Sequence, residues 1–454
     1  MVLNSLQKTN FSSFIRNSLL FENIDIISFL FLVLTIISTS FAQTNIIGIL
    51  AALFSLACFL KAVVKRGETA ELSLINKVLI LYLLFVIISL MGASYFILSL
   101  KGIIKTFIYI AFYFASVYFL SQNKKKIIPL IFITAGLTVI ESIIAVIQNM
   151  SHIEAIATWQ DTSNVANPIH IISRAYGTLK PYNPNLLAGY LITGISSVFA
   201  IFGISCINKN KKMILISLAA FLITIFAVFA TGCRGAYLGL FGLAGIAFLT
   251  GFLIVKKYFG SFKNIKMKYK IMLSAFVVFI SGLIFLVPSF SQRILSIFSL
   301  RKDSSISFRM NVYEACYRMF ADNKFLGIGV GNKNFREIYG LYMKTGYDAL
   351  GSYCVPLEIA VESGIFALIS FSAFIILIIV KIIKYLNSKN KHPVHKIIVY
   401  SVLLTITAVM CHGLFDTVFF RPQIQILFWL NIAVFHSIVI KIRKQKINSA
   451  NSAY

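Results

Sequence analysis

The chain has 454 residues, of which 58% are hydrophobic and only 13% are charged. Soluble domains carry about 25% charged residues, so this chain has too little polar surface to cover itself in water. The formal net charge of +27 is divided among short basic clusters between apolar runs. This distribution excludes one continuous nucleic-acid-binding patch and is typical of inner-membrane loops. The composition therefore predicts a polytopic protein with the lipid bilayer, and no nucleic acid, as its partner.

Twelve apolar runs are long enough to cross a bilayer, which takes about 20 mostly apolar residues in a helix. They show neither heptads nor strict alternation, so neither a coiled coil nor a β-barrel fits. We expect an all-α membrane helix bundle with about 12 transmembrane helices. The runs start near Ile26, Ile46, Val78, Ile103, Ile127, Leu186, Met213, Ala236, Ile271, Pro356, Ile397 and Ile424.

Every second connection between these runs is rich in lysine. These connections lie on the same side of the membrane, and they hold 24 of the 31 lysines. The positive-inside rule places this side in the cytoplasm. We therefore expect a multi-pass protein of the inner (plasma) membrane, with both termini cytoplasmic and two long outer loops at about residues 148–185 and 289–355. No cleavable signal peptide is evident in the first 25 residues. The predicted divisions are N-terminal helices with the first long loop (1–185), a membrane domain (186–440) and a basic cytoplasmic tail (441–454).

Arginine is distributed in the opposite way, because eight of the 11 arginines fall on the outer side. The planar guanidinium matches phosphate bidentately and keeps its charge when partly desolvated. The pattern therefore predicts an anionic ligand, such as a lipid pyrophosphate, at the outer face, unless these arginines only pair with outer acids. Arg234 makes the strongest case because it lies in a tight connection between two spans, with no acid nearby in sequence.

Three outer segments carry the most distinctive motifs. The first has RAYGT at 174–178 and NPNLLA at 183–188, and the second has TGCRGA at 231–236. The third runs from Arg309 through GIGVGN at 327–332 to Glu358 and Glu362. Their order and spacing resemble the O-antigen ligase and polymerase family of bacterial membrane glycan transferases, over about residues 174–429. The ending, with HGLFDT at 412–417 and FRPQ at 420–423, resembles a cyanobacterial branch once named bicarbonate transporters.

The resemblance implies a metal-independent transferase that needs no cofactor and works at the periplasmic or outer face. Its donor would be a glycan on undecaprenyl pyrophosphate, and its acceptor a glycan or lipid hydroxyl. Arg234 and Arg309 match the family arginines that hold the pyrophosphate. The family's histidine base is replaced here by Tyr353, and a phenol with a pKa of about 10 is a poor base at neutral pH. Either another group supplies the base or the activity differs.

Several polar residues near the outer mouth are candidates for this site, and each has a structural alternative in packing, capping or ion pairing. Glu358, Glu362, Asp416 and His412 are alternative bases, and the two glutamates are spaced to share a helix face. The expected catalytic residues are Arg234, Arg309, Tyr353, Glu358 and His412. The expected substrate-binding residues are Arg174, Asn183, Asn185, Arg318, Arg336, Glu362, Asp416 and Arg421.

Other features favour structural readings. The glycines at 327–331 lack the lysine of a phosphate-binding loop and predict a sharp turn after an amphipathic helix at 307–320. His392 and His395 have no third ligand nearby in sequence, so no metal site is expected. Glu141 lies inside a span and needs a partner. The rival functions are a transporter of a small anion or of a lipid-linked glycan, and a binding partner without catalysis.

Overall fold

The computed structural model describes residues 18–64, 68–70, 73–151, 174–259, 304–389, 391–440 and 442–444. It confirms an all-α membrane bundle, because ten of its helices are long and apolar enough to span a bilayer. Helices suit these segments because lipid offers no hydrogen-bond partner for an unpaired backbone. The ten spans are α4 (Ile24–Phe41), α5 (Thr44–Val64), α6 (Leu74–Ile88) continued by η1 (Ser89–Gly92), α7 (Phe96–Gln122), α8 (Ile127–Met150) preceded by η2 (Lys124–Lys126), α9 (Pro184–Ile207), α10 (Lys211–Ala230), α16 (Val355–Asn387), α17 (Pro393–Gly413) and α18 (Pro422–Val439).

Eleven of the twelve predicted starts fall within described helices. The start near Ala236 belongs to α11 (Arg234–Phe259), which is apolar over Arg234–Thr250. The start near Ile271 lies outside the described residues. The remaining described elements are short or extramembranous: α3 (Leu19–Glu22), α14 (Ser304–Asp322), α15 (Asn332–Tyr339), η7 (Val418–Phe420) and the antiparallel pair β1 (Glu68–Ala70) and β2 (Ile442–Lys444).

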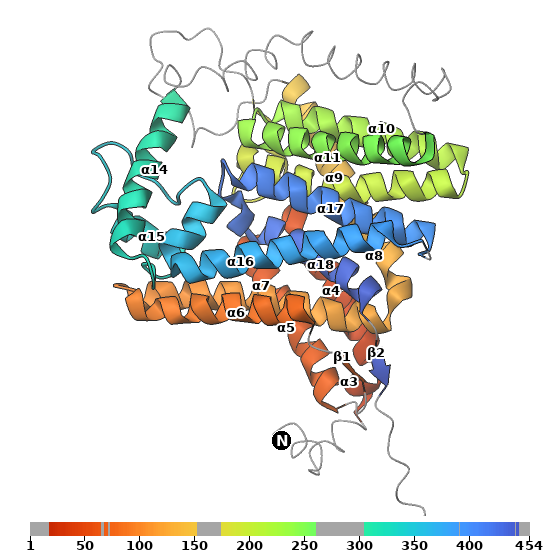
Figure 1. Cartoon of the computed structure of the whole chain (residues 1–454), viewed down its shortest axis with the longest axis horizontal. Coiled ribbons are helices and arrows are strands. Elements are labelled where there is room, and N and C mark those ends of the chain that lie inside the picture. Colours follow the sequence, from red (N-terminus) through yellow and green to blue (C-terminus); the bar gives the residue numbers. More distant parts are fainter. Residues whose placement is uncertain are drawn as a thin grey trace, which may run out of the picture.

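The spanning helices lie roughly side by side, with α9 to α11 on one side of the bundle and α5 to α7 on the other (Figure 1). Between them α17 packs on α9 and α11, α16 packs on α6, and α18 packs on α7. Small residues allow the closest approaches. A Cβ on Gly194 of α9 would lie only 2.0 Å from the hydroxyl oxygen of Thr138 on α8.

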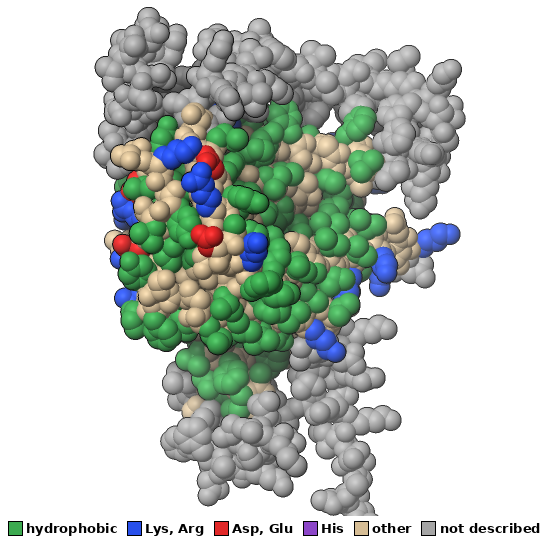
Figure 2. Space-filling view, turned by 60° about the vertical axis from the view of Figure 1, so that its left-hand side comes forward, with side chains coloured by type: hydrophobic (Ala, Val, Ile, Leu, Met, Phe, Trp, Pro, Cys, Tyr) green, Lys and Arg blue, Asp and Glu red, His purple; other side chains and the backbone are tan. Residues whose placement is uncertain are grey.

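The two ends of the bundle differ in charge. Helices α14 and α15 stand at one end, opposite the lysine-bearing connections such as η2 (Figure 1). Figure 2 shows apolar side chains along the bundle, and basic and acidic side chains together on the end with α14 and α15. We call that end the outer end, following the positive-inside rule. Helices α14 and α15 share their own small core, made of Val312, Ala315, Cys316, Met319, Ile328, Phe335, Ile338, Tyr339, Ala349 and Val361.

A break in α16 fastens this outer part to the bundle. Gly364 has φ = 78° and ψ = 176°, so its backbone is not helical. The loop at residues 324–331, which we call the glycine loop, binds the exposed backbone, because the N–H groups of Ile328 and Gly329 donate to the carbonyls of Val361 (2.9 Å) and Glu362 (3.0 Å). Gly327 and Gly329 have positive φ values of 71° and 91°. The turn predicted for residues 327–331 is therefore confirmed, and so is the helix predicted before it.

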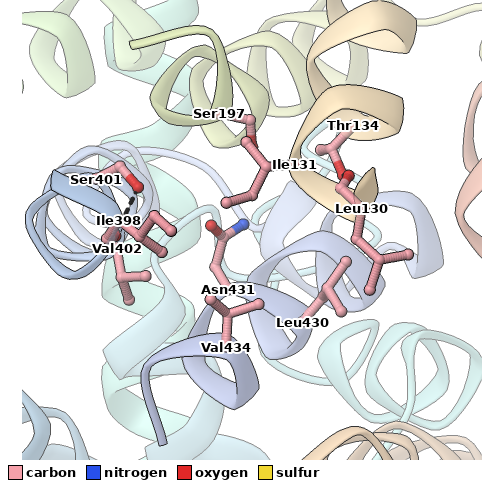
Figure 3. Close-up of a pocket in the computed structure, with 10 residues that line it drawn as sticks. All are labelled: Leu130, Ile131, Thr134, Ser197, Ile398, Ser401, Val402, Leu430, Asn431 and Val434. Carbon is pink, nitrogen blue, oxygen red and sulfur yellow. Dashed lines mark hydrogen bonds between the residues drawn. The ribbon is translucent and has the colours of Figure 1, made fainter. Parts of the chain in front are cut away.

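The inner halves of the spans contain a cavity of about 10 Å³ among α8, α9, α17 and α18 (Figure 3). Its polar lining includes Thr134, Ser197, Ser401 and Asn431. This volume suits about one water molecule. The cavity is therefore too small for a substrate and lies away from the outer residues of interest.

Candidate active site at the outer ends of the helices

Arg174 ties three outer segments together. Its Nε donates to the carbonyl of Thr231 (2.8 Å), and its Nη2 donates to Oδ1 of Asn185 (2.6 Å). The Nδ2 of Asn185 in turn donates to Oδ2 of Asp416 (2.9 Å). Three predicted substrate-binding residues are thus brought together, in a chain that links the start of α9 to the turn before α11 and to the connection after α17.

Asn183 takes the structural alternative. Its side-chain oxygen accepts hydrogen bonds from the N–H groups of Asn185 (2.8 Å) and Leu186 (3.4 Å), and Pro184 follows as the first residue of α9. An asparagine in this position satisfies backbone donors that the first helical turn leaves open. The cap therefore explains Asn183 without a sugar.

The segment before this cap is held by groups inside the membrane. Oε2 of Glu141 accepts from the N–H of Thr178 (3.0 Å), and Oε1 accepts from its hydroxyl. Gln148 accepts from the N–H groups of Tyr176 and Gly177 at 3.0 and 2.9 Å. Glu141 therefore has the partner that its position in α8 demanded.

Arg234 is the first residue of α11 and is half-buried. It follows a sharp turn in which Gly232 has φ = 62° and the hydroxyl of Thr231 accepts from the N–H of Cys233 (3.2 Å). Gly235 comes next, and a Cβ there would lie 2.8 Å from Cδ2 of His412. The predicted small-residue turn thus places Arg234 beside the outer end of α17.

Three buried side chains meet at that point. Cys233, His412 and Asp416 offer a sulfur, a ring nitrogen and a carboxylate oxygen that all lie within 4.8 Å of one another. The Sγ of Cys233 is 3.6 Å from Nε2 of His412. We call this group the Cys–His–Asp cluster. Sequence analysis singled out His412 and Asp416 as candidate bases and grouped Cys233 only with the other outer cysteines, Cys316 and Cys354, as a candidate for a disulfide. All three cysteines are free.

Arg309 of α14 lies close to the same cluster. Its charge is within electrostatic range of His412 and Cys233. Its Cζ is also 5.7 Å from the ring centroid of Tyr353, a distance suited to a cation–π contact. Cys233 directly precedes Arg234, so Arg309 lies near the turn from which Arg234 extends.

Tyr353 is poorly suited to the role of base. Burial raises its pKa to about 12, against the opposing effect of the Arg309 charge. Such a phenol is protonated at neutral pH and can donate a proton but not accept one. Its ring packs on Phe308, with centroids 5.8 Å apart. We therefore do not assign proton abstraction to Tyr353, although it stays close to Arg309.

Glu358 and Glu362 are both buried in the outer half of α16. Glu358 accepts a hydrogen bond from the N–H of Ser352 (2.6 Å), and Glu362 accepts one from the N–H of Gly331 (2.9 Å). Asp416 and Arg421 lie within electrostatic range of Glu358. Glu358 thus belongs to the same region as the Cys–His–Asp cluster, whereas the bonded partner of Glu362 is the glycine loop.

Arg318 and Arg336 have acidic partners in the outer part of the chain. Arg318 pairs with Glu314 on α14, and Arg336 pairs with Asp348. All four side chains are exposed, so these ion pairs are screened by water and contribute little to stability. These two arginines therefore form ion pairs with acidic side chains, which was the structural alternative to substrate binding.

Comparison with known proteins identifies a related domain. Residues 219–372 match the family model of O-antigen ligase. This stretch runs from α10 through α11 and α14 into α16, and it includes Arg234, Arg309, Tyr353, Glu358 and Glu362. The search of curated proteins found no match. The match supports membrane glycan transfer of the O-antigen ligase type at the level of the family, and it does not confirm the bicarbonate-transporter branch.

Proposed function

We propose that the protein transfers a glycan from a polyprenyl pyrophosphate to an acceptor hydroxyl at the outer face of the bacterial inner membrane. The observation that supports the proposal is that Arg309 lies near the Cys–His–Asp cluster, whose Cys233 directly precedes Arg234, inside the stretch that matches O-antigen ligase. Two guanidinium groups suit a diphosphate because each binds two oxygens in a fixed plane. Arg234 also opens α11, and backbone N–H groups at a helix start favour anions.

The chemistry requires one bond to form as another breaks. The acceptor oxygen bonds to the anomeric carbon, the bond from that carbon to the phosphate oxygen breaks, and the electron pair leaves with the diphosphate. Arginines fixed at the site stabilise the charge that develops on the leaving group. The acceptor proton passes to a base, for which Glu358, Asp416 and His412 are the candidates in this outer region.

The test is reconstitution of the full chain in liposomes with a polyprenyl-pyrophosphate-linked glycan and an acceptor glycan. We expect transferred glycan and released lipid pyrophosphate. Arg309→Gln and Arg234→Gln should each lower kcat/KM by about 100-fold or more, because each removes a charge that matters most in the transition state. Lys333→Gln is the control, since it removes one positive charge from an exposed residue of α15 in the same outer region.

Loss of activity only in the arginine variants would support the proposal. Equal activity of wild type and Arg309→Gln would overturn the assigned pyrophosphate site. Absence of transfer from any such donor, together with saturable bicarbonate uptake by the same liposomes, would favour the transporter alternative. Binding of the donor without any turnover would favour a non-catalytic partner in an envelope assembly.

A further inference from the structure

The Cys–His–Asp cluster has the composition of a transition-metal site. A thiol, an imidazole and a carboxylate reach one point from the turn before α11, the end of α17 and the connection that follows it. All three residues are buried. Thiolate and imidazole are ligands that zinc prefers, and carboxylate oxygens complete many zinc sites.

The distances between the three ligand atoms fit a zinc ion. With zinc bonds of about 2.3 Å to sulfur and about 2.0 Å to nitrogen or oxygen, tetrahedral ligands lie roughly 3.3–3.6 Å apart. The separation between Sγ of Cys233 and Nε2 of His412 is 3.6 Å, and no pair in the cluster exceeds 4.8 Å. Small side-chain rotations would therefore close the cluster around an ion.

The surroundings hold two of the ligands in place. Oδ1 of Asp416 accepts from the N–H of Val418 (3.1 Å), and Oδ2 accepts from Nδ2 of Asn185 (2.9 Å). Such outer hydrogen bonds orient metal-binding carboxylates. The imidazole of His412 packs closely against two glycines. A Cβ on Gly235 would lie 2.8 Å from its Cδ2, and a Cβ on Gly189 would lie 3.3 Å from its Cε1.

The charge balance also favours a divalent cation. Bound to the metal, the cluster would contain one thiolate, one carboxylate and a neutral imidazole, so that a divalent ion makes the unit neutral. Arg309 and Arg174 lie within electrostatic range of Cys233 and add positive charge from outside. A metal site with no net charge costs less to bury near those arginines than a site whose ligands do not neutralise the metal.

We propose that Cys233, His412 and Asp416 bind one divalent transition-metal ion of the zinc class, with a fourth position left for water or another ligand. The thiol proton is released to solvent when the metal binds. The site would cross-link the turn before α11 to the connection between α17 and α18, and so fix Arg234, which directly follows Cys233. The metal would have a structural role. His412 and Asp416 would then be ligands, which leaves Glu358 as the base among the three candidates. The proposal departs from the expectation of no metal site, and it does not rest on glycan transfer.

The experiment uses the full chain, purified in detergent and stripped with a chelator. Zinc content is measured by elemental analysis after dialysis, and Co²⁺ is titrated while the thiolate-to-cobalt charge-transfer band is recorded. We expect one metal per chain, a charge-transfer band and visible bands of tetrahedral cobalt. Cys233→Ser should abolish the charge-transfer band and weaken binding at least 10-fold, because a thiolate ligand is lost.

Two matched controls separate this site from others. Cys354→Ser replaces another outer cysteine, which is free and half-buried. His395→Asn disrupts the inner pair of His392 and His395, whose rings lie 5.6 Å apart and offer a competing metal site. Neither control should change the band. A band that survives in Cys233→Ser, or metal binding that is lost in His395→Asn, would overturn the proposal.

A variant that fails to fold is recognised by thermal unfolding. Zinc should raise the Tm of the wild type, since a ligand that binds only the folded state stabilises it. Zinc should not raise the Tm of Cys233→Ser, even where that variant starts from a lower value. If stoichiometric zinc changes neither the Tm nor the spectrum of the wild type, the cluster is a plain thiol–imidazole contact and the proposal is wrong.

Discussion

Tyr353 has φ = 54°, a backbone conformation that residues other than glycine seldom adopt. Strained residues of this kind occur often where a site needs a side chain in one position. In this conformation the ring lies against both Phe308 and Arg309. The phenol is thus placed as a neutral neighbour of a guanidinium.

The pH dependence of transfer tests this role of Tyr353. A group whose pKa is about 12 is protonated throughout the range from about pH 6 to 9. Its ionisation therefore causes no rise or fall of kcat/KM in that range. Tyr353→Phe keeps the ring beside Arg309 and should leave the pH profile of kcat/KM unchanged, with a loss of less than about 10-fold. A profile that loses its lower limb, together with a fall of about 100-fold or more, would make Tyr353 the base after all.

Residue types and spacing predicted much of the candidate site but not its contacts. Arg174, Asn185, Asp416 and His412 were singled out from the sequence, and the structure brings them together. The role of Cys233 could not be predicted, because its partner His412 lies 179 positions away in the chain. The hydrogen bonds of Asn185 with Arg174 and Asp416 likewise depend on how α9 packs against α17.

At the scale of elements, α16 shows how a helix can be broken without leaving its backbone unpaired. The interruption at Gly364 lies where the glycine loop supplies donors and an acceptor, since the N–H of Ile365 also donates to the carbonyl of Lys324 (2.9 Å). The sequence predicted one continuous span here. It could not reveal the break, because the loop that bonds to the interrupted backbone comes earlier in the chain and meets α16 only in the folded protein.

Alanine substitutions at two glycines separate close packing from backbone strain. Gly364→Ala would place a Cβ 2.1 Å from the carbonyl oxygen of Phe325, at a positive φ of 78°. Gly346→Ala meets a similar φ of 88° but has nothing within 4 Å. We expect Gly364→Ala to lower stability by about 3 kcal/mol or more and Gly346→Ala by about 1 kcal/mol.

Thermal unfolding in detergent measures this difference, with Gly340→Ala as a third variant. Gly340 has a helical φ of −53°, and its nearest contact to an added Cβ is 3.4 Å, so the change should be small. Equal loss of Tm at Gly364 and Gly346 would show that backbone strain alone matters. The contact between α16 and the outer loop would then have no special weight.

For the molecule as a whole, the distribution of basic residues predicted the orientation of the bundle. The structure places η2, with three lysines, and the outer helices α14 and α15 at opposite ends (Figure 1). One apparent loop lysine behaves differently. Lys61 is buried at the end of α5 and pairs with Asp25 and Gln122. A count of charges therefore cannot distinguish a buried, paired lysine at the inner end of a helix from a solvated lysine in a loop.

Accessibility labelling tests the orientation. Lys344 is exposed near α15, and Lys125 is exposed in η2. In a Cys206→Ser, Cys354→Ser background, Lys344→Cys should react with a membrane-impermeant maleimide in intact spheroplasts, whereas Lys125→Cys should react only after permeabilisation, because the positive-inside rule keeps η2 in the cytoplasm. Unaltered transfer activity of each variant would show that the label reports the native arrangement. If Lys125→Cys reacts first, the charged arginine face points to the cytoplasm, and a lipid-linked donor presented outside the cell could not reach Arg234 and Arg309.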